Sequence, residues 1–147
     1  MRHERVNGQL ARTLADFEEG WIGDAALGAR LLTLDDAAAA EIAATGVQVL
    51  AQAYVGSDSK IGFGTVINAG AVVSHDCQLG KVVNLSPGAL LAGNVTVEDY
   101  AQIGMGATVN LHITIGRLAR IGNGATVKAD VPAESRVYAG TIWPVRI

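Results

Sequence analysis

Two adjacent side chains, His75 and Asp76, are the residues of this sequence best suited to acid–base chemistry. They lie in the stretch VVSHDCQLG, which carries no other ionised side chain. An exposed imidazole next to a carboxylate can act as a general base, because the carboxylate raises the basicity of the ring. The alternative reading is a solvated histidine beside a turn, with no chemical role.

The elements that must position this pair are set by a six-residue repeat. The residue three places after each repeated aliphatic is often Gly, Asn or Asp, which tolerate a positive φ, and the next residue is small or apolar. Each hexad therefore predicts a short strand followed by a tight turn, with successive coils stacked in parallel. The repeated aliphatics are Val49, Val55, Ile61, Ile67, Val73, Leu79, Leu85, Leu91, Val97, Ile103, Val109, Ile115, Ile121 and Val127, and the predicted turn residues are Asp58, Gly64, Gly70, Asp76, Gly88, Asn94, Gly106, Gly124 and Asp130.

This repeat resembles the hexapeptide-repeat left-handed parallel β-helix, in which three hexads close one triangular coil. The resemblance implies an all-β fold over residues 47–147, including a C-terminal tail, and it stacks residues that are 18 apart. His75 then has Gly93 directly above it, about one strand spacing (~4.8 Å) away. A glycine amide at that distance is a candidate oxyanion donor, which acyl transfer needs in addition to a base.

Residues 1–46 are predicted to form a helical N-terminal cap on the coil stack. Thr33 opens a capping box for a helix over 34–45 that Gly46 ends, and GDAALGARLL reads as another helix. We expect the segment YAGTIWPVRI to cover the other end of the stack. Residues 1–46 contain no glycine-rich turn of the kind that marks a nucleotide-binding βαβ unit.

Composition excludes several other classes of protein. At 147 residues the chain is long enough for one main domain, half of its residues are apolar, and the formal net charge is −3. No basic run is present, which argues against nucleic-acid or anionic-membrane binding. No segment matches a signal peptide or a membrane span, so we expect a cytoplasmic protein. The only cysteine, Cys77, is expected to be a core thiol.

The block over residues 47–140 resembles the sialic acid O-acetyltransferase and nucleotide-amino-sugar N-acetyltransferase family. The motif HDCQLG followed by LSPGALLAGNV carries the likeness. The resemblance implies acetyl-CoA as co-substrate, with His75 as the general base and Asp76 polarising its imidazole. It also implies that the backbone amide of Gly93 meets the thioester carbonyl. The acceptor would be an amine or hydroxyl of a sugar or a similar small molecule.

The same resemblance implies a cofactor site between the protomers of a homotrimer. Asn84 stands where family members have a second histidine that contacts acetyl-CoA, and Met105 and Asn123 match turns that line the cofactor cleft. Trp143 and Pro144 depart from the usual C-terminal ending. The basic residues available for the CoA phosphates are Lys81, Arg117, Arg120, Lys128, Arg136 and Arg146.

Two other interpretations remain open at this point. The first is a catalytically inactive trimeric scaffold that has lost its acceptor-binding domain, which Asn84 and the altered tail suggest. The second is a zinc hydratase on a related fold, which needs three converging histidines. The chain has only His3, His75 and His112, and His3 lies outside the repeats. No metal is therefore expected.

Overall fold

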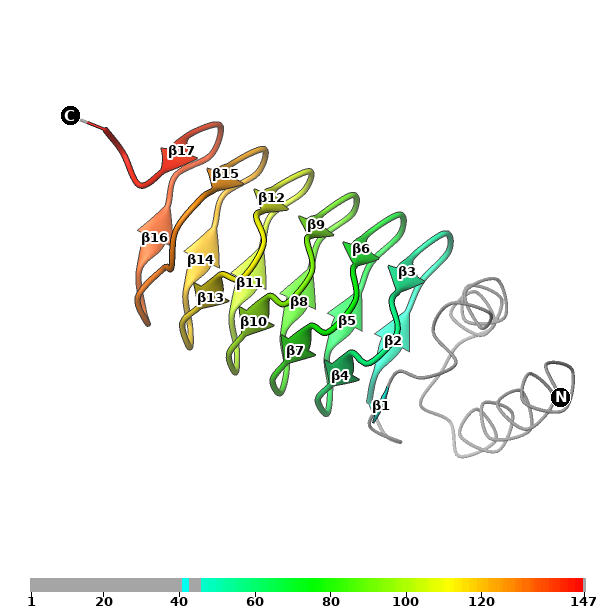
Figure 1. Cartoon of the computed structure of the whole chain (residues 1–147). Helices are drawn as coiled ribbons and strands as arrows, with labels where there is room; N and C mark the ends of the chain where they lie inside the picture. The colour runs from blue at the N-terminus through cyan, green and yellow to red at the C-terminus, as the bar shows by residue number, and fades with distance from the viewer. Residues whose placement is uncertain (1–40, 43–45, 147) are drawn as a thin grey trace, which may run out of the picture.

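The computed structural model describes residues 41–42 and 46–146, which wind into a β-helix of short parallel strands (Figure 1). The strands are β1 (Glu41–Ile42), β2 (Gln48–Val49), β3 (Tyr54–Val55), β4 (Lys60–Ile61), β5 (Val66–Ile67), β6 (Val72–Val73), β7 (Gln78–Leu79), β8 (Asn84–Leu85), β9 (Leu90–Leu91), β10 (Thr96–Val97), β11 (Gln102–Ile103), β12 (Thr108–Val109), β13 (Thr114–Ile115), β14 (Arg120–Ile121), β15 (Thr126–Val127), β16 (Arg136–Val137) and β17 (Ile142–Trp143). The prediction of an all-β parallel β-helix is confirmed.

Three parallel sheets form the sides of a triangular prism. Sheet A has the order β1-β4-β7-β10-β13, sheet B the order β2-β5-β8-β11-β14-β16, and sheet C the order β3-β6-β9-β12-β15-β17. The chain passes from A to B to C, so the prism has an A–B edge (turns 63–64, 81–82, 99–100, 117–118 and 133–134), a B–C edge (51–52, 69–70, 87–88, 105–106, 123–124 and 139–140) and a C–A edge (57–58, 75–76, 93–94 and 111–112).

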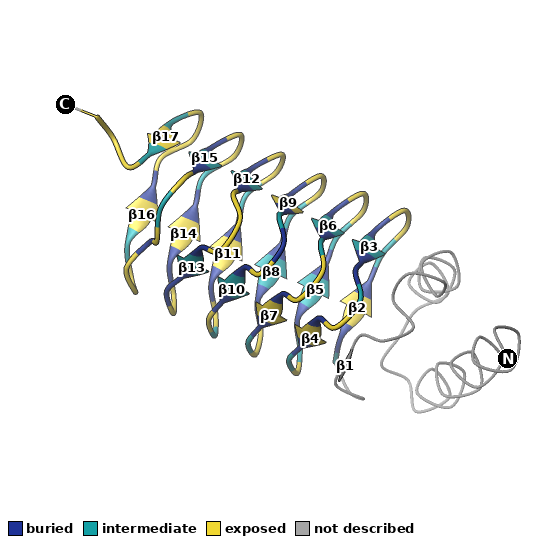
Figure 2. Ribbon diagram, in the orientation of Figure 1, coloured by how far each residue is buried: buried dark blue, intermediate teal, exposed yellow. Residues whose placement is uncertain are grey.

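The core is the column of aliphatic side chains that the repeat predicts. The second residue of each strand from β2 to β15 points inward, and every one of these side chains is at most 4% exposed. Small residues such as Ala71, Ala89 and Ala107 fill the corners and are fully buried. Exposed residues lie at the turns and at the outward first position of several strands, as Figure 2 shows. The buried core therefore lies inside the coils, while the first residue of each strand faces outward.

Backbone hydrogen bonds between coils fix the register. The amide of Gln102 donates to the carbonyl of Ala119 at 2.9 Å, and that of Gly104 to Ile121 at 2.8 Å. Strand partners are 18 residues apart through most of the stack, as in Val73 with Leu91. Residues 18 apart therefore lie one above the other, as predicted.

The predicted turn residues adopt a positive φ with one exception. Asp58, Asp76 and Asn94 have φ values of 58°, 57° and 57°. The prediction was wrong for Asp130, because the connection after β15 is two residues shorter than the others. Val131 bridges Ile115 and takes the inward place, and the Oδ1 atom of Asp130 accepts a hydrogen bond from the amide of Thr114 at 2.8 Å. From this point partners are 16 residues apart.

The described prism ends in β1 on one side and in β17 on the other. Glu41 and Ile42 form β1 and pair with Lys60 and Ile61 of β4, so the predicted helix over 34–45 is wrong at these two residues. Pairing with β4 satisfies backbone groups that would otherwise be an open sheet edge. The rest of the predicted cap lies outside the described residues. At the other end Trp143 packs half-buried against the core, as expected of the tail.

The core assignment predicts very different costs for the same substitution at two leucines. Leu85 is fully buried, whereas Leu111 on the C–A edge is 57% exposed. Leu85→Ala should lower the free energy of unfolding by about 2–5 kcal/mol, because it leaves a cavity. Leu111→Ala should change it by no more than about 0.5 kcal/mol. Urea denaturation at a fixed protein concentration checks both values, and equal shifts would contradict the inward column.

Candidate active site

His75 and Asp76 form the turn of the C–A edge between β6 and β7. The Nδ1 atom of His75 lies 2.7 Å from Oδ2 of Asp76. The two side chains are 58% and 50% exposed, so solvent reaches both. A paired imidazole and carboxylate therefore stand on the outer edge of the prism, where a second molecule can approach them.

Turn geometry explains Asp76 but not His75. Asp58 and Asn94, one coil before and one coil after, take the same positive φ as Asp76 at the same edge. Asp and Asn are favoured in that conformation. The position of His75 is occupied by Ser57 and Gly93 in the neighbouring coils, so the turn makes no demand on its type. An exposed ion pair contributes only about 0–1 kcal/mol, so stability does not explain the histidine either.

The contact with Asp76 determines which ring nitrogen can act as a base. An ionised carboxylate only accepts hydrogen bonds, so it pairs with the Nδ1–H tautomer of the neutral ring. The lone pair is then on Nε2, the nitrogen that does not face Asp76. The pair therefore holds the ring in the tautomer that can take a proton from a molecule bound at the edge.

Gly93, one coil further along the prism, lies directly against the imidazole. A Cβ atom on Gly93 would lie 2.6 Å from both Cε1 and Nε2 of His75, closer than two such atoms approach. The carbonyl of His75 accepts a hydrogen bond from the amide of Asn94 at 3.0 Å, which fixes the two coils against each other. Within residues 46–146 the N–H of Gly93 donates to no acceptor. The predicted place of Gly93 over His75 is confirmed, and its amide can donate to a bound group.

Cys77, two residues beyond His75, belongs to the core. It is fully buried, and its Sγ atom lies 3.2 Å from the carbonyl oxygen of Ala92. Burial raises the pKa of the thiol, so it stays protonated and unreactive at neutral pH. The expectation of a core thiol is confirmed, and Cys77 is no nucleophile for this site.

The remaining predicted site residues lie on another side of the same prism. Asn84 is the first residue of β8 in sheet B, and Met105 and Asn123 are on the B–C edge, where Oδ1 of Asn123 accepts from the amide of Met105 at 2.9 Å. Asn84 follows His75 by half of an 18-residue coil, so the two face away from each other. One copy of the chain unites His75, Asp76 and Gly93, but not Asn84, Met105 or Asn123 with them.

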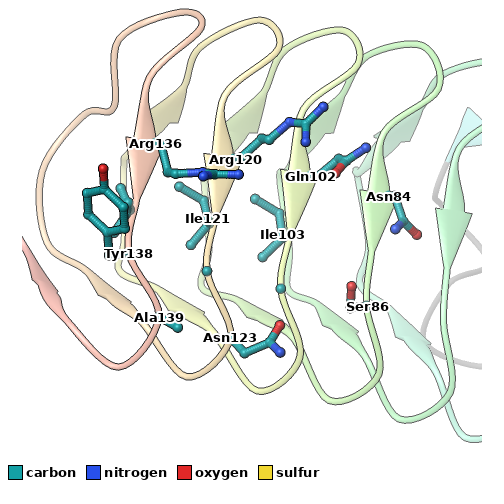
Figure 3. Close-up of a pocket in the computed structure, with 13 residues that line it drawn as sticks. Asn84, Ser86, Gln102, Ile103, Arg120, Ile121, Asn123, Arg136, Tyr138 and Ala139 are labelled. Carbon is teal, nitrogen blue, oxygen red and sulfur yellow. The ribbon is translucent and has the colours of Figure 1, made fainter.

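A groove of about 410 Å³ runs along the outer face of sheet B (Figure 3). It is lined by Asn84, Ser86, Gln102, Ile103, Gly104, Arg120, Ile121, Gly122, Asn123, Arg136, Val137, Tyr138 and Ala139. Asn84 and Asn123 are thus brought to one groove, and Met105 is not among its lining residues. Gln102 and Tyr138 were missed from the sequence. The 18-residue spacing from Asn84 to Gln102 was the available signal for the first of them.

The described part of the chain offers neither a metal-binding cluster nor a membrane-spanning helix. No three or more His, Cys, Asp or Glu side chains in that part of the chain cluster in a way that could hold a metal ion. None of its segments is a helix with the length and apolar character needed to cross a membrane.

Comparison with known proteins gives matches among solved structures. No family model and no curated protein matches the chain. The acetyltransferase domain of PglB from Neisseria gonorrhoeae, in complex with acetyl coenzyme A, is similar over 70% of this chain and 50% of that one, with 35% identity and a TM-score of 0.68. PerB from Caulobacter crescentus, in complex with CoA and GDP-perosamine, is similar over 68% and 51%, with 38% identity and a TM-score of 0.64.

WeeI from Acinetobacter baumannii is similar over 73% of this chain and 51% of its own, with 34% identity and a TM-score of 0.64. The chain therefore spans about half the length of these three relatives.

The packing of His75 on Gly93 predicts the effect of a single methyl group. Gly93→Ala should displace the imidazole, because the new Cβ would occupy the ring's place. The fold should persist, since the side chain of His75 is exposed and can move. A shift of the His75 ring resonances with an unchanged melting temperature would confirm this. Leu111→Ala, one coil further along the same edge, is the control and should leave those resonances in place.

Proposed function

We propose that the chain is an acetyl-CoA-dependent acetyltransferase, because its β-helix is similar to the acetyltransferase domain of PglB and to PerB. The acceptor is an amine or hydroxyl of a sugar or a similar small molecule. The observation that carries the proposal is the exposed imidazole of His75, held by Asp76 and lying against Gly93. The likeness to domains solved with acetyl-CoA or CoA supports the choice of donor.

His75 acts as the general base in the proposed reaction. Nε2 takes a proton from the acceptor as its nitrogen or oxygen attacks the thioester carbon, and collapse of the tetrahedral intermediate breaks the C–S bond and releases CoA. The N–H of Gly93 donates to the developing oxyanion. General-base help is worth about 10²–10⁴ in rate. An oxyanion donor contributes about 2.7–4 kcal/mol to transition-state stability.

We infer that the complete site is shared between two copies in a homotrimer. His75 is on the C–A edge of one prism, and Asn84 is in sheet B, half a coil away, so a donor that contacts both must lie between two chains. Placing the C–A edge of each prism against sheet B of the next is a heterologous contact, which closes into a ring of three when each copy is rotated by one third of a turn. Asn123 on the B–C edge of one copy would then lie near His75 of the next.

The A–B edge is the part of the prism best suited to the three-fold axis of this trimer. Phe63, Val82, Tyr100 and Leu118 are stacked along it and are between 40% and 52% exposed. Val82, Tyr100 and Leu118 hold positive φ values of 54° to 63° without being glycine, which is costly for a β-branched residue such as Val82. Burial between copies would offset that cost and remove an apolar ridge from water.

An inactive scaffold is the second candidate function. The observation that favours it is Asn84, which stands where the family has a histidine that contacts acetyl-CoA. Asn84 retains an amide that can donate to a carbonyl, so donor binding is expected to persist. Binding of CoA without release of free thiol, with every amino-sugar, sialic acid and small-alcohol acceptor tried, would support the scaffold against the enzyme.

His75→Asn should abolish most of the acetyl transfer while leaving CoA binding unchanged. Loss of the base should lower kcat by roughly 10²–10⁴. Asp76→Asn should lower kcat less, because the ring keeps its place but loses the carboxylate that sets its tautomer. Release of free thiol from acetyl-CoA measures turnover, and the thermal shift caused by CoA measures binding.

Asp58→Asn is the matched control for the carboxylate. Asp58 lies one coil earlier on the same edge, with a φ of 58° against 57° for Asp76, and is likewise exposed. It should leave kcat unchanged. Wild-type turnover in His75→Asn would remove the proposed mechanism, and the absence of both turnover and a CoA-induced thermal shift in the wild type would remove the proposed function.

The double variant Tyr100→Glu, Leu118→Glu should convert the trimer to monomers. Two carboxylates on the A–B edge would be buried beside one another at the axis. Glutamate fits the turn itself, since Glu134 occupies the same edge in the next coil with a φ of 62°. Light scattering after size exclusion measures the mass. Leu90→Glu on the outer face of sheet C is the control and should stay trimeric. A trimeric double variant would place the interface elsewhere.

A further inference from the structure

Two arginines lie side by side on sheet B at the far end of the groove from Asn84. Arg120 and Arg136 are register partners in β14 and β16, and Gln102 and Asn84 continue the same outward column. Adjacent strands are about 4.8 Å apart, so the column from Asn84 to Arg136 extends roughly 14 Å. Figure 3 shows the two arginine side chains extended in the same direction, toward β11.

The charge of this pair has no counterpart in the groove. No Asp or Glu lines it, and no ion pair in the described residues involves Arg120 or Arg136. Two adjacent guanidinium groups repel each other, and this arrangement occurs in a chain whose net charge is −3. An anion with several oxygens would relieve the repulsion, because each guanidinium can donate two parallel hydrogen bonds to phosphate.

An exposed aromatic ring lies beside the arginines. Tyr138 follows Arg136 by two residues and so lies on the same outward face, and it is 69% exposed. It closes the β16 end of the groove in Figure 3. A free aromatic face next to phosphate-binding arginines fits a nucleotide, because nucleobases stack on such rings whatever their sequence.

We propose that Arg120 and Arg136 bind the phosphate groups of CoA and that Tyr138 stacks on its adenine. This inference rests on the proposed function. The thioester end of the donor would lie near Asn84 and the neighbouring copy's edge, and the nucleotide end would follow the sheet B column to β16. The pair makes the enzyme selective for donors that carry the nucleotide, over thioesters of pantetheine alone.

Calorimetric titration with CoA and with pantetheine, which lacks the nucleotide and its phosphates, tests the inference. Wild-type protein should bind CoA far more tightly than pantetheine. Arg120→Gln and Arg136→Gln should each weaken CoA binding roughly tenfold and leave pantetheine binding unchanged, because only charge-assisted hydrogen bonds to phosphate are lost. Added salt should weaken the binding of CoA to the wild type more than its binding to a variant that carries both Arg120→Gln and Arg136→Gln.

Two further variants complete the experiment. Tyr138→Ala should weaken CoA binding by roughly fivefold or more without altering pantetheine binding. Lys60→Gln removes one positive charge from β4, near the opposite end of the prism from β16, and should leave CoA affinity unchanged. Acetyl-CoA and acetyl-pantetheine as donors give a second readout, in which the arginine variants should raise KM for acetyl-CoA alone.

The possible results separate this inference from the proposed function. If both arginine variants bind CoA as tightly as the wild type, or if they lose pantetheine binding to the same extent as CoA binding, the phosphate assignment is wrong. The proposed acetyltransferase function is unaffected by either result. Dissociation of the arginine variants into monomers would assign the pair to contacts between copies and also overturn it. A wild-type protein that binds no CoA would remove the proposed function and this inference with it.

Discussion

Each coil of the prism must return its backbone into hydrogen-bonding register with the coil before it, and this requirement determines what the rest of the chain can do. With 18 residues per coil, outward side chains form straight columns, and the inward aliphatics form a core so narrow that only one column fits on each side. Stability comes from that core and from the ladders, as in other repeat architectures. The outward columns and the edges are consequently free to carry binding and catalytic groups.

The C–A edge illustrates this freedom. Its second turn position requires a positive φ and holds Asp58, Asp76, Asn94 and then His112. Its first position makes no such demand and varies between Ser57, His75, Gly93 and Leu111 in successive coils. The turn thus favours a carboxylate at its second position, and it leaves the residue type at its first position unconstrained. The fold also supplies the bare glycine above the imidazole at no cost to the core.

Much of this could be predicted from the sequence, because a six-residue period specifies the inward side chains and the resemblance to three-hexad coils specifies which residues stack. The inward column from Val49 to Val127 and the place of Gly93 over His75 followed from counting alone once three hexads per coil were assumed. The contact between Nδ1 of His75 and Asp76 depends on side-chain rotamers, which periodicity does not determine. Strand β1 also escaped prediction, since the alanine-rich segment around Glu41 and Ile42 has helical propensity and pairing with β4 overrides it.

The arginine pair shows why the groove could not be read from the sequence. A strict 18-residue spacing stacks Tyr138 on Arg120 and separates Arg136 from both. The connection after β15 is two residues short, so Arg136 moves onto Arg120 and Tyr138 moves to the next outward place, just beyond β16. The shortened corner lies near Asp130, on the far side of the prism from the groove that it alters. A local change in one turn therefore resets the register of every later strand, and in this chain it brings two cations together beside an aromatic ring.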